Sequence, residues 1–226
     1  PRHSKENKPN RRELGRIMWV ECRKRVQDNI QTVLRPLGTM EAHGVTANGT
    51  DIIAPVMMAR AIAERVNAMI APVVPYGYTG VRDAYPGGFT IPEQVYREYV
   101  RAVLVGLAGN RFRNIILLNG HGGGQTAILS ALAQEVGRET KSRILAINWW
   151  SYCSDVVQEI YGEDGGHAGN TELAYRLAVD AARVPKARYT GIELATAARA
   201  TKTWRPCGVH HSHRSHTRGQ GCAAGG

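Results

Sequence analysis

The sequence predicts an α/β fold: a single three-layer domain in which helices flank a mostly parallel sheet. Short apolar runs that end in turn residues alternate along the chain with longer stretches of helical periodicity. Strands and helices that alternate at these lengths imply right-handed crossovers, and therefore parallel strands. The 226 residues are enough for one domain with additional termini, and the hydrophobic fraction of 43% is ordinary for a globular protein.

Four apolar runs are predicted to be the strands of this sheet. Each is short and is followed by turn-forming residues, as expected for strands that are buried on both faces. They cover residues 31–37, 68–74, 114–118 and 143–148.

Five helices are predicted between and after these strands. They cover residues 51–66, 93–108, 125–136, 151–161 and 171–179. Within the second of them, four apolar residues recur at four-residue spacing, which predicts a stripe that packs on the sheet. These residues are Val95, Tyr99, Val103 and Leu107.

The positive charge of the chain is concentrated at its two ends. The net charge is +10, and it divides into +6 over residues 1–25, +7 over residues 183–226 and −3 between them. Basic tails are usually solvated, whereas nucleic-acid enzymes carry their positive field on the folded body, so this distribution disfavours nucleic-acid binding. We therefore predict a basic arm over residues 1–16, a folded domain over 17–200 and a basic His/Gly-rich tail over 201–226 that is disordered or atypical.

No feature of the sequence indicates a membrane or a secretory route. The chain has no apolar run near the roughly 20 residues that a bilayer crossing needs. Its first residues lack the apolar core of a secretory signal. The expected location is the cytoplasm.

Three of the eight histidines lie in the patterned central part of the chain, each among small residues. They are His43 in GTMEAHG, His121 in LLNGHGGG and His167 in EDGGHAGNTE. Each motif follows a predicted strand, and open α/β sheets bind ligands beyond the carboxyl ends of their strands. A single such motif could equally be a loop histidine or a glycine turn, but three at one edge predict one metal site.

Acidic residues accompany the first histidine. Glu41 and His43 are two residues apart, so in an extended segment their side chains point the same way. Asp51 follows at the start of a predicted helix, where it is either a ligand or a favourable partner of the helix dipole. The glycines around His121 allow a tight turn; the alternative, a phosphate-binding loop, lacks the usual lysine and hydroxyl.

Four motifs in this order resemble the creatininase family of metal-dependent amidohydrolases. They are PLGTMEAHG, NGTD, NGHGG and GGHAGNTE, and the resemblance spans about residues 19–179. It implies that residues 17–200 form a single α/β domain, often hexameric in the family, with two divalent ions at the strand ends. It also implies a small amide as substrate and a homo-oligomeric assembly.

The resemblance implies a role for each motif residue. The metal ligands are Glu41, His43, Asp51, His121 and Glu172. Asp51 would bridge the two ions, and His167 would be the catalytic residue. Carboxylates and imidazoles suit Zn or Mn, with Fe(II) also possible, and no cysteine lies near a motif. Histidine can protonate a leaving amine near pH 7, and Asp164 either orients His167 or caps a turn.

The motifs depart from those of the creatinine hydrolases. Gly122 and Gly123 stand where those enzymes carry a Tyr-Glu pair, and Gly166 stands where they tend to place an acid. These departures disfavour creatinine and favour the branches that hydrolyse formamides, lactam-like or cyclic ketone rings, or a peptide bond. Tentative substrate contacts, each of which could instead serve packing or a turn, are Thr79, Tyr85 and Trp150.

The sequence as a whole predicts a divalent-metal-dependent amidohydrolase that cleaves a non-peptide C–N bond with a metal-activated water. Two alternatives stay open. One is a catalytically impaired binding protein on the same scaffold, which would use its basic ends on an acidic partner. The other is a metal phosphoesterase, although the motifs have no obvious Lys/Arg clamp nearby.

Overall fold

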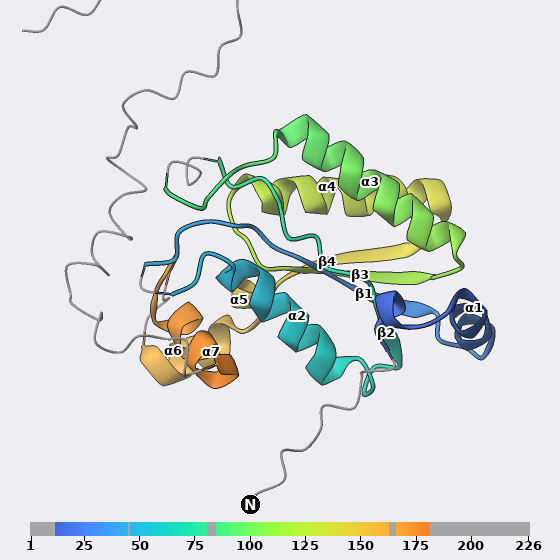
Figure 1. Cartoon of the computed structure of the whole chain (residues 1–226), viewed down its shortest axis with the longest axis horizontal. Coiled ribbons are helices and arrows are strands. Elements are labelled where there is room, and N and C mark those ends of the chain that lie inside the picture. Colours follow the sequence, from blue (N-terminus) through green and yellow to red (C-terminus); the bar gives the residue numbers. More distant parts are fainter. Residues whose placement is uncertain (1–11, 45, 81–84, 163–165, 181–226) are drawn as a thin grey trace, which may run out of the picture.

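The computed structural model describes residues 12–44, 46–80, 85–162 and 166–180 of the chain (Figure 1). Most of the predicted N-terminal arm, the whole predicted tail and Asp164 lie outside these described residues. Among the described helices, none combines the length with the apolar character that a bilayer crossing would require.

The core of the fold is a four-stranded sheet, and every strand pairing in it is parallel. The strand order is β2-β1-β3-β4. The strands are β1 (Thr32–Leu37), β2 (Ala68–Ile70), β3 (Asn114–Asn119) and β4 (Arg143–Asn148). The predicted fold class is confirmed, and the predicted bounds of β4 match the observed ones.

Strand β2 is shorter than predicted. Regular pairing stops at Ile70, and a single isolated bridge between Val74 and Leu37 continues the direction of the strand. Pro72 lies between these points and has no N–H to donate to a ladder, which explains the early end.

The described helices follow the predicted order, with two differences. Their bounds are η1 Leu14–Arg16, α1 Trp19–Gln27, α2 Thr50–Ile62, α3 Glu93–Gly109, α4 Gly124–Thr140, α5 Trp149–Tyr152, α6 Ser154–Tyr161 and α7 Asn170–Asp180. Helix α1 was not predicted; none of its residues is fully buried, so it carries little apolar signal. The helix predicted over 151–161 is divided at Cys153 into α5 and α6.

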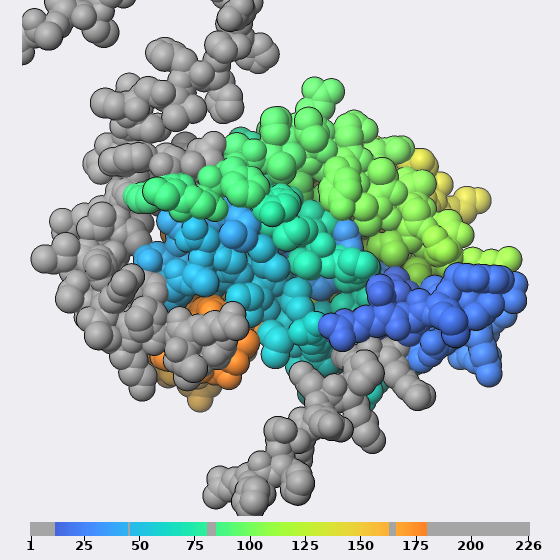
Figure 2. All heavy atoms as spheres, in the orientation of Figure 1, coloured from blue at the N-terminus to red at the C-terminus, as the bar shows by residue number. Residues whose placement is uncertain are grey.

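Helices cover both faces of the sheet, giving the predicted three layers (Figure 1). Helices α3 and α4 pack on one face, where Val33 and Leu117 meet Leu129 and Leu132 in the larger core. Helix α2 packs on the other face, where Leu34 is in a smaller cluster. In the space-filling view, α3 lies across the upper side of the molecule (green in Figure 2).

The predicted apolar stripe of α3 is wrong by one position over its first turns, although its last residue, Leu107, packs against the larger core. Val95 and Tyr99 are 56% and 52% exposed, whereas Tyr96, Val100 and Leu104 are buried. Both rows are largely apolar and both have four-residue spacing, so spacing alone could not choose between them. Which row meets the sheet depends on the rotation of α3 about its own axis, which is set by its packing on neighbouring elements.

Three backbone segments meet at the carboxyl ends of β1 and β3. A Cβ on Gly38 would come within 2.4 Å of the Asp51 carbonyl oxygen, and one on Gly120 within 1.9 Å, so only glycine fits at either position. Pro55 lies one helical turn after Asp51 and has no N–H for that carbonyl. The loops after both strands therefore press directly on the first turn of α2.

Candidate metal centre

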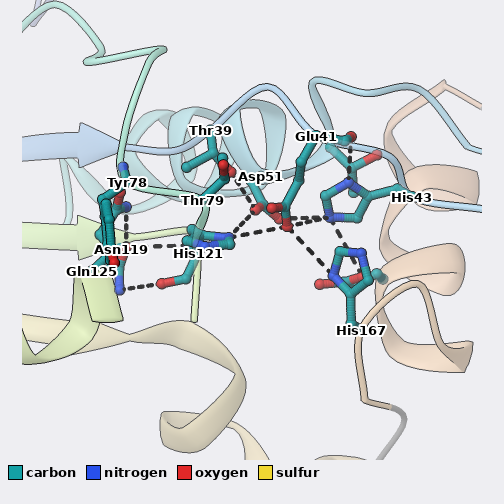
Figure 3. Close-up of polar contacts among 12 residues, drawn as sticks. Thr39, Glu41, His43, Asp51, Tyr78, Thr79, Asn119, His121, Gln125 and His167 are labelled. Atoms are coloured by element: carbon teal, nitrogen blue, oxygen red, sulfur yellow. Dashed lines mark hydrogen bonds and ion pairs between the residues drawn. The ribbon is translucent and has the colours of Figure 1, made fainter. Parts of the chain in front are cut away.

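The five predicted metal ligands and His167 converge at this edge of the sheet. Figure 3 shows four of the ligands and His167. Glu41 and His43 come from the loop after β1, and Asp51 comes from the first turn of α2. His121 follows β3, and Glu172 comes from the first turn of α7. Residues that are far apart in the sequence are thus brought together at the ends of β1 and β3 and the first turns of α2 and α7.

One potential metal position lies on the inner side of Asp51. The Nδ1 atom of His121 is 2.9 Å from Asp51 Oδ2 and 3.0 Å from Glu41 Oε1. One ligand atom of each of the three residues lies within 4.8 Å of the others, which fits a single divalent ion. All three side chains are at most 3% exposed. Buried carboxylates with an imidazole are a donor set suited to Zn or Mn.

A second position uses the other oxygen of Asp51. His43 Nε2 is 2.8 Å from Asp51 Oδ1 and 3.7 Å from Glu172 Oε2. These three residues also form a group that could hold an ion. Because Oδ1 faces one group and Oδ2 the other, Asp51 has the geometry of a carboxylate that bridges two ions.

Hydrogen bonds orient the prospective ligands. The Nδ1 atom of His43 is 3.0 Å from the Glu41 carbonyl oxygen, which can only accept, so Nδ1 carries the proton and Nε2 is left to bind metal. Thr39 donates its hydroxyl to Asp51 Oδ2 at 2.8 Å. The Ala168 N–H donates to Glu172 Oε2 at 2.6 Å. Ligand orientation is therefore established by the protein itself.

The charges of the cluster shift one another's pKa values. Burial alone would lower the pKa of His43, but Asp51 and the neighbouring carboxylates outweigh it and raise the pKa to about 9. The pKa of His121 is also raised to about 9, because Asp51 and Glu41 outweigh burial. Burial raises the pKa of Glu172 to about 7. Burial acts against ionised Asp51, yet His43 and His121 hold its pKa well below the usual range.

We expect the metal-free protein to lose stability as the pH rises from about 6.5 to about 9. The folded-state pKa values of His43 and His121, about 9, lie above the ordinary histidine value of 6.5. Their contribution is therefore complete below about pH 6.5 and is lost as the pH rises through 9. For each histidine, the rise of the pKa from 6.5 to about 9 corresponds to roughly 3 kcal/mol.

Urea unfolding of chelator-treated protein at pH 6 and pH 9.5 measures this loss. Saturating Zn²⁺ should oppose it, because metal binding needs deprotonated imidazoles and strengthens as the pH rises. Equal stability of the metal-free protein at both pH values would contradict the prediction.

His167 lies beside the cluster and points into it (Figure 3). Its Nε2 is 2.8 Å from the Ala42 carbonyl oxygen, and its Nδ1 is 3.5 Å from Glu41 Oε1. Since a carbonyl can only accept, Nε2 carries a proton and Nδ1 faces the ligand cluster. His167 also forms a third possible metal group with Glu41 and His43, so its geometry suits either proton transfer or coordination.

A pocket of about 200 Å³ opens above these residues. The ligands Asp51, His121 and Glu172 line one part of it, and Trp149, Trp150 and Val157 line another. Among the predicted substrate contacts, Trp150 lines the pocket, whereas Thr79 and Tyr85 are not among its lining residues. Thr79 is buried, and its N–H donates to the Thr90 hydroxyl.

Sequence reasoning missed three polar residues that support the site. Thr39 bonds to Asp51, while Asn119 and Gln125 bond around the backbone of His121. Each is fully buried. The sequence signal for these residues was a hydroxyl or amide side chain beside a ligand motif, at a strand end or a helix start. Ordinary turns show the same residue types, so the signal could not identify supporting residues.

The glycines after His121 have different backbone requirements. Gly123 has φ 62° and ψ −143°, close to a region that only glycine occupies readily. Gly122 has no positive φ, and a Cβ there would meet only Trp150, at 3.7 Å. A side chain is therefore tolerated at the first position of the Gly122-Gly123 pair and strained at the second.

We expect Gly123→Ala to destabilise the protein by about 1–3 kcal/mol, because alanine is strained at this φ and ψ. Gly122→Ala is the matched control and should cost less than about 1 kcal/mol, since its new methyl makes only an ordinary contact. Urea unfolding of the two variants compares them directly. Equal destabilisation would show that the conformation at Gly123 imposes no special demand.

A family model described as "Creatininase: Creatinine amidohydrolase" matches residues 15–223. A creatinine amidohydrolase of Pseudomonas putida is 25% identical over 185 residues, which cover 74% of this chain and 71% of that protein. A 3-dehydro-scyllo-inosose hydrolase of Thermotoga maritima is 27% identical over 158 residues, covering 65% of this chain and 50% of that protein. A mycofactocin precursor peptide peptidase of Mycobacterium ulcerans is 29% identical over 164 residues, covering 65% and 57%.

Solved structures share the fold. A crystal structure of creatinine amidohydrolase (creatininase) superposes with a TM-score of 0.72 at 23% identity, covering 79% of this chain and 76% of that one. Two further structures, one described as "Creatininase Mn" and one as a mutant creatininase of Zn–Zn type, each give a TM-score of 0.71. Their identities are 24% and 23%, and each match covers 78% of this chain and 76% of the other. At this identity the superpositions establish a common architecture.

Proposed function

The chain belongs to the creatininase family, and from this premise we propose that it is a divalent-metal-dependent amidohydrolase that cleaves a C–N bond of a small amide. One observation carries the proposal: two groups of potential ligands share Asp51. Its Oδ1 faces His43 in one group, and its Oδ2 faces His121 in the other. This arrangement fits two adjacent divalent ions. The chain spans 71% of the length of one curated relative and 50% and 57% of two others. Its activity is therefore proposed from the residues of this chain.

The proposal gives each residue a role. Glu41, Asp51 and His121 would hold one ion, and His43, Asp51 and Glu172 would hold the other. The pair, when bound, would supply an activated water near neutral pH and polarise the carbonyl of the substrate. His167, which lines the pocket beside the ligands, would give a proton to the leaving amine.

The pocket favours a small, uncharged substrate. A volume of about 200 Å³ suits a compact molecule, and the described lining residues include no lysine or arginine. An anionic phosphate ester would find no lysine or arginine among these lining residues to supplement the ions, which favours the amide over the phosphoesterase alternative. Trp150 offers an aromatic wall, and we propose a cyclic amide, a formamide or a related amide as substrate.

The metal identity and the wider organisation are also proposals. Zn and Mn, or Fe, are the proposed ions, and mutant Zn–Zn type and Mn structures of creatininases are consistent with the first two. We propose a homo-oligomer, hexameric by family resemblance, in the cytoplasm. Residues 17–200 would form the amidohydrolase domain, with basic segments at 1–16 and 201–226.

Elemental analysis of the purified protein tests the proposal first. About two divalent ions per chain are expected, and a panel of formamides, lactams and short peptides should then include a compound that is hydrolysed only by the metal-loaded protein. A phosphate monoester serves as the control substrate. A correctly folded protein that has no affinity for Zn²⁺ or Mn²⁺ would overturn the proposal.

A further inference from the structure

A buried network of amides surrounds the backbone of His121 (Figure 3). The Asn119 side chain accepts the His121 N–H at its Oδ1 (3.1 Å) and donates its Nδ2 to the His121 carbonyl oxygen (2.6 Å). One side chain therefore holds both backbone groups of the histidine. Glycines precede and follow His121, so no neighbouring side chain restricts its backbone, and Asn119 adds to the anchoring that the Gly120 contact with Asp51 provides on one side.

A second amide fixes the orientation of the first. Gln125 Nε2 donates to Asn119 Oδ1 at 2.9 Å, while Gln125 Oε1 accepts the Tyr78 N–H at 3.1 Å. The Tyr78 N–H can only donate, so the Gln125 amide has one satisfied orientation, and this in turn sets the orientation of Asn119. Both side chains are fully buried.

The network has further support on either side. Asn119 Nδ2 also donates to Asn148 Oδ1, at the end of β4, at 2.8 Å. A Cβ on Gly77 would come within 2.1 Å of Gln125 Oε1, so the backbone before Tyr78 lies against the amide. The segment 77–78, the end of β4 and the His121 loop are thereby joined through two side chains.

We propose that Asn119 and Gln125 are positioning residues that hold His121 so that its Nδ1 faces Glu41 and Asp51. The inference rests on the proposed metal-dependent function and concerns only the ion at Glu41, Asp51 and His121. Asn119 acts on the backbone of His121 directly, and Gln125 acts through Asn119. Partners that orient a metal ligand typically change metal affinity by about 10–100-fold when they are removed.

Gln125→Glu tests the inference with almost no change of shape. One carboxylate oxygen can still accept the Tyr78 N–H, but the other then faces Asn119 Oδ1, and two acceptors repel. If Asn119 turns its amide to relieve this, its NH₂ group faces the His121 N–H and that bond is lost. Either response disturbs the backbone of His121.

Calorimetric titration of metal-free protein with Zn²⁺ is the measurement. We expect two binding steps in the unaltered protein and, in Gln125→Glu, one step weakened about 10–100-fold with the other within about 3-fold. Gln134→Glu is the matched control, because it makes the same change at an exposed position of α4 and should leave both steps unchanged. Circular dichroism verifies that each variant is folded.

Three results would overturn the inference. They are an unchanged Zn²⁺ affinity in folded Gln125→Glu, an equal weakening of both steps, which would indicate a general structural role, and a loss in the Gln134→Glu control. If Gln125→Glu does not fold, Gln125→Met removes the same hydrogen bonds without a charge and must weaken the same single step. Absence of Zn²⁺ binding by the unaltered protein would instead contradict the proposed function itself, and the inference with it.

Discussion

Asp51→Asn should abolish the metal centre, lowering the metal content from about two ions per chain to nearly none. Its two oxygens face the two histidines separately, Oδ1 at 2.8 Å from His43 and Oδ2 at 2.9 Å from His121. An amide keeps the shape but loses the charge and one acceptor. Because even the hydrogen-bond partners of ligands are worth about 10–100-fold in affinity, we expect the loss of Zn²⁺ affinity to exceed about 100-fold.

Mass-spectrometric metal analysis after dialysis measures this effect. Asp155→Asn provides the matched control, since Asp155 is an exposed acid in the first turn of α6. It should retain both ions. If Asp51→Asn kept two ions while folded, the bridging role of Asp51 would be wrong and the ions would have to be held elsewhere.

His167→Ala should lower kcat by about 10²–10⁴-fold without removing metal, because loss of a positioned proton donor typically has this effect. The imidazole is held by its bond to the Ala42 carbonyl, with Nδ1 directed at the ligand cluster. KM should change little, since the substrate carbonyl would still meet both ions. The kinetic measurement uses the amide that the panel identifies as a substrate.

Metal analysis of the same variant separates proton transfer from coordination. His167 also belongs to a possible metal group with Glu41 and His43. Two retained ions with a reduced kcat would support the proton donor, and added imidazole should restore part of the activity. Loss of one ion would instead make His167 a ligand.

The convergence of the candidate ligands could be predicted largely from the motifs, because Glu41, His43 and His121 follow the ends of β1 and β3. Parallel strands bring their carboxyl ends to one edge, so Glu41, His43 and His121 were expected to converge before any distance was known. Which ligand faces which oxygen of Asp51 could not be predicted. That depends on the approach of Gly38 and Gly120 to α2, which has no signature beyond two glycines.

In the fold, too, some elements could be predicted from local sequence pattern and others could not. Strands β1, β3 and β4 were predicted to within one residue, because each is a continuous apolar run bounded by turns. Strand β2 was overextended because its apolar residues continue past Pro72, where pairing cannot. The buried row of α3 and the existence of α1 depend on packing between elements. Local pattern carries little information about such contacts.

The supporting amides were missed for a different reason. Asn119 and Gln125 are common residue types at a strand end and a helix start, and the side chain of either could have formed hydrogen bonds with solvent. Their role comes from complete burial, since a buried amide must find partners for each of its polar atoms. Burial is a property of the assembled fold, so only the structure could assign them.

The contact of Gly38 and Gly120 with the backbone of Asp51 has a thermodynamic consequence. Main-chain atoms of three segments touch there with no side chain between them, so the spacing of the ligand-bearing segments is set when the chain folds. An arriving ion then has few torsions left to restrict. The conformational entropy that a flexible site loses on binding has already been lost in folding, and tight binding should come with little structural rearrangement.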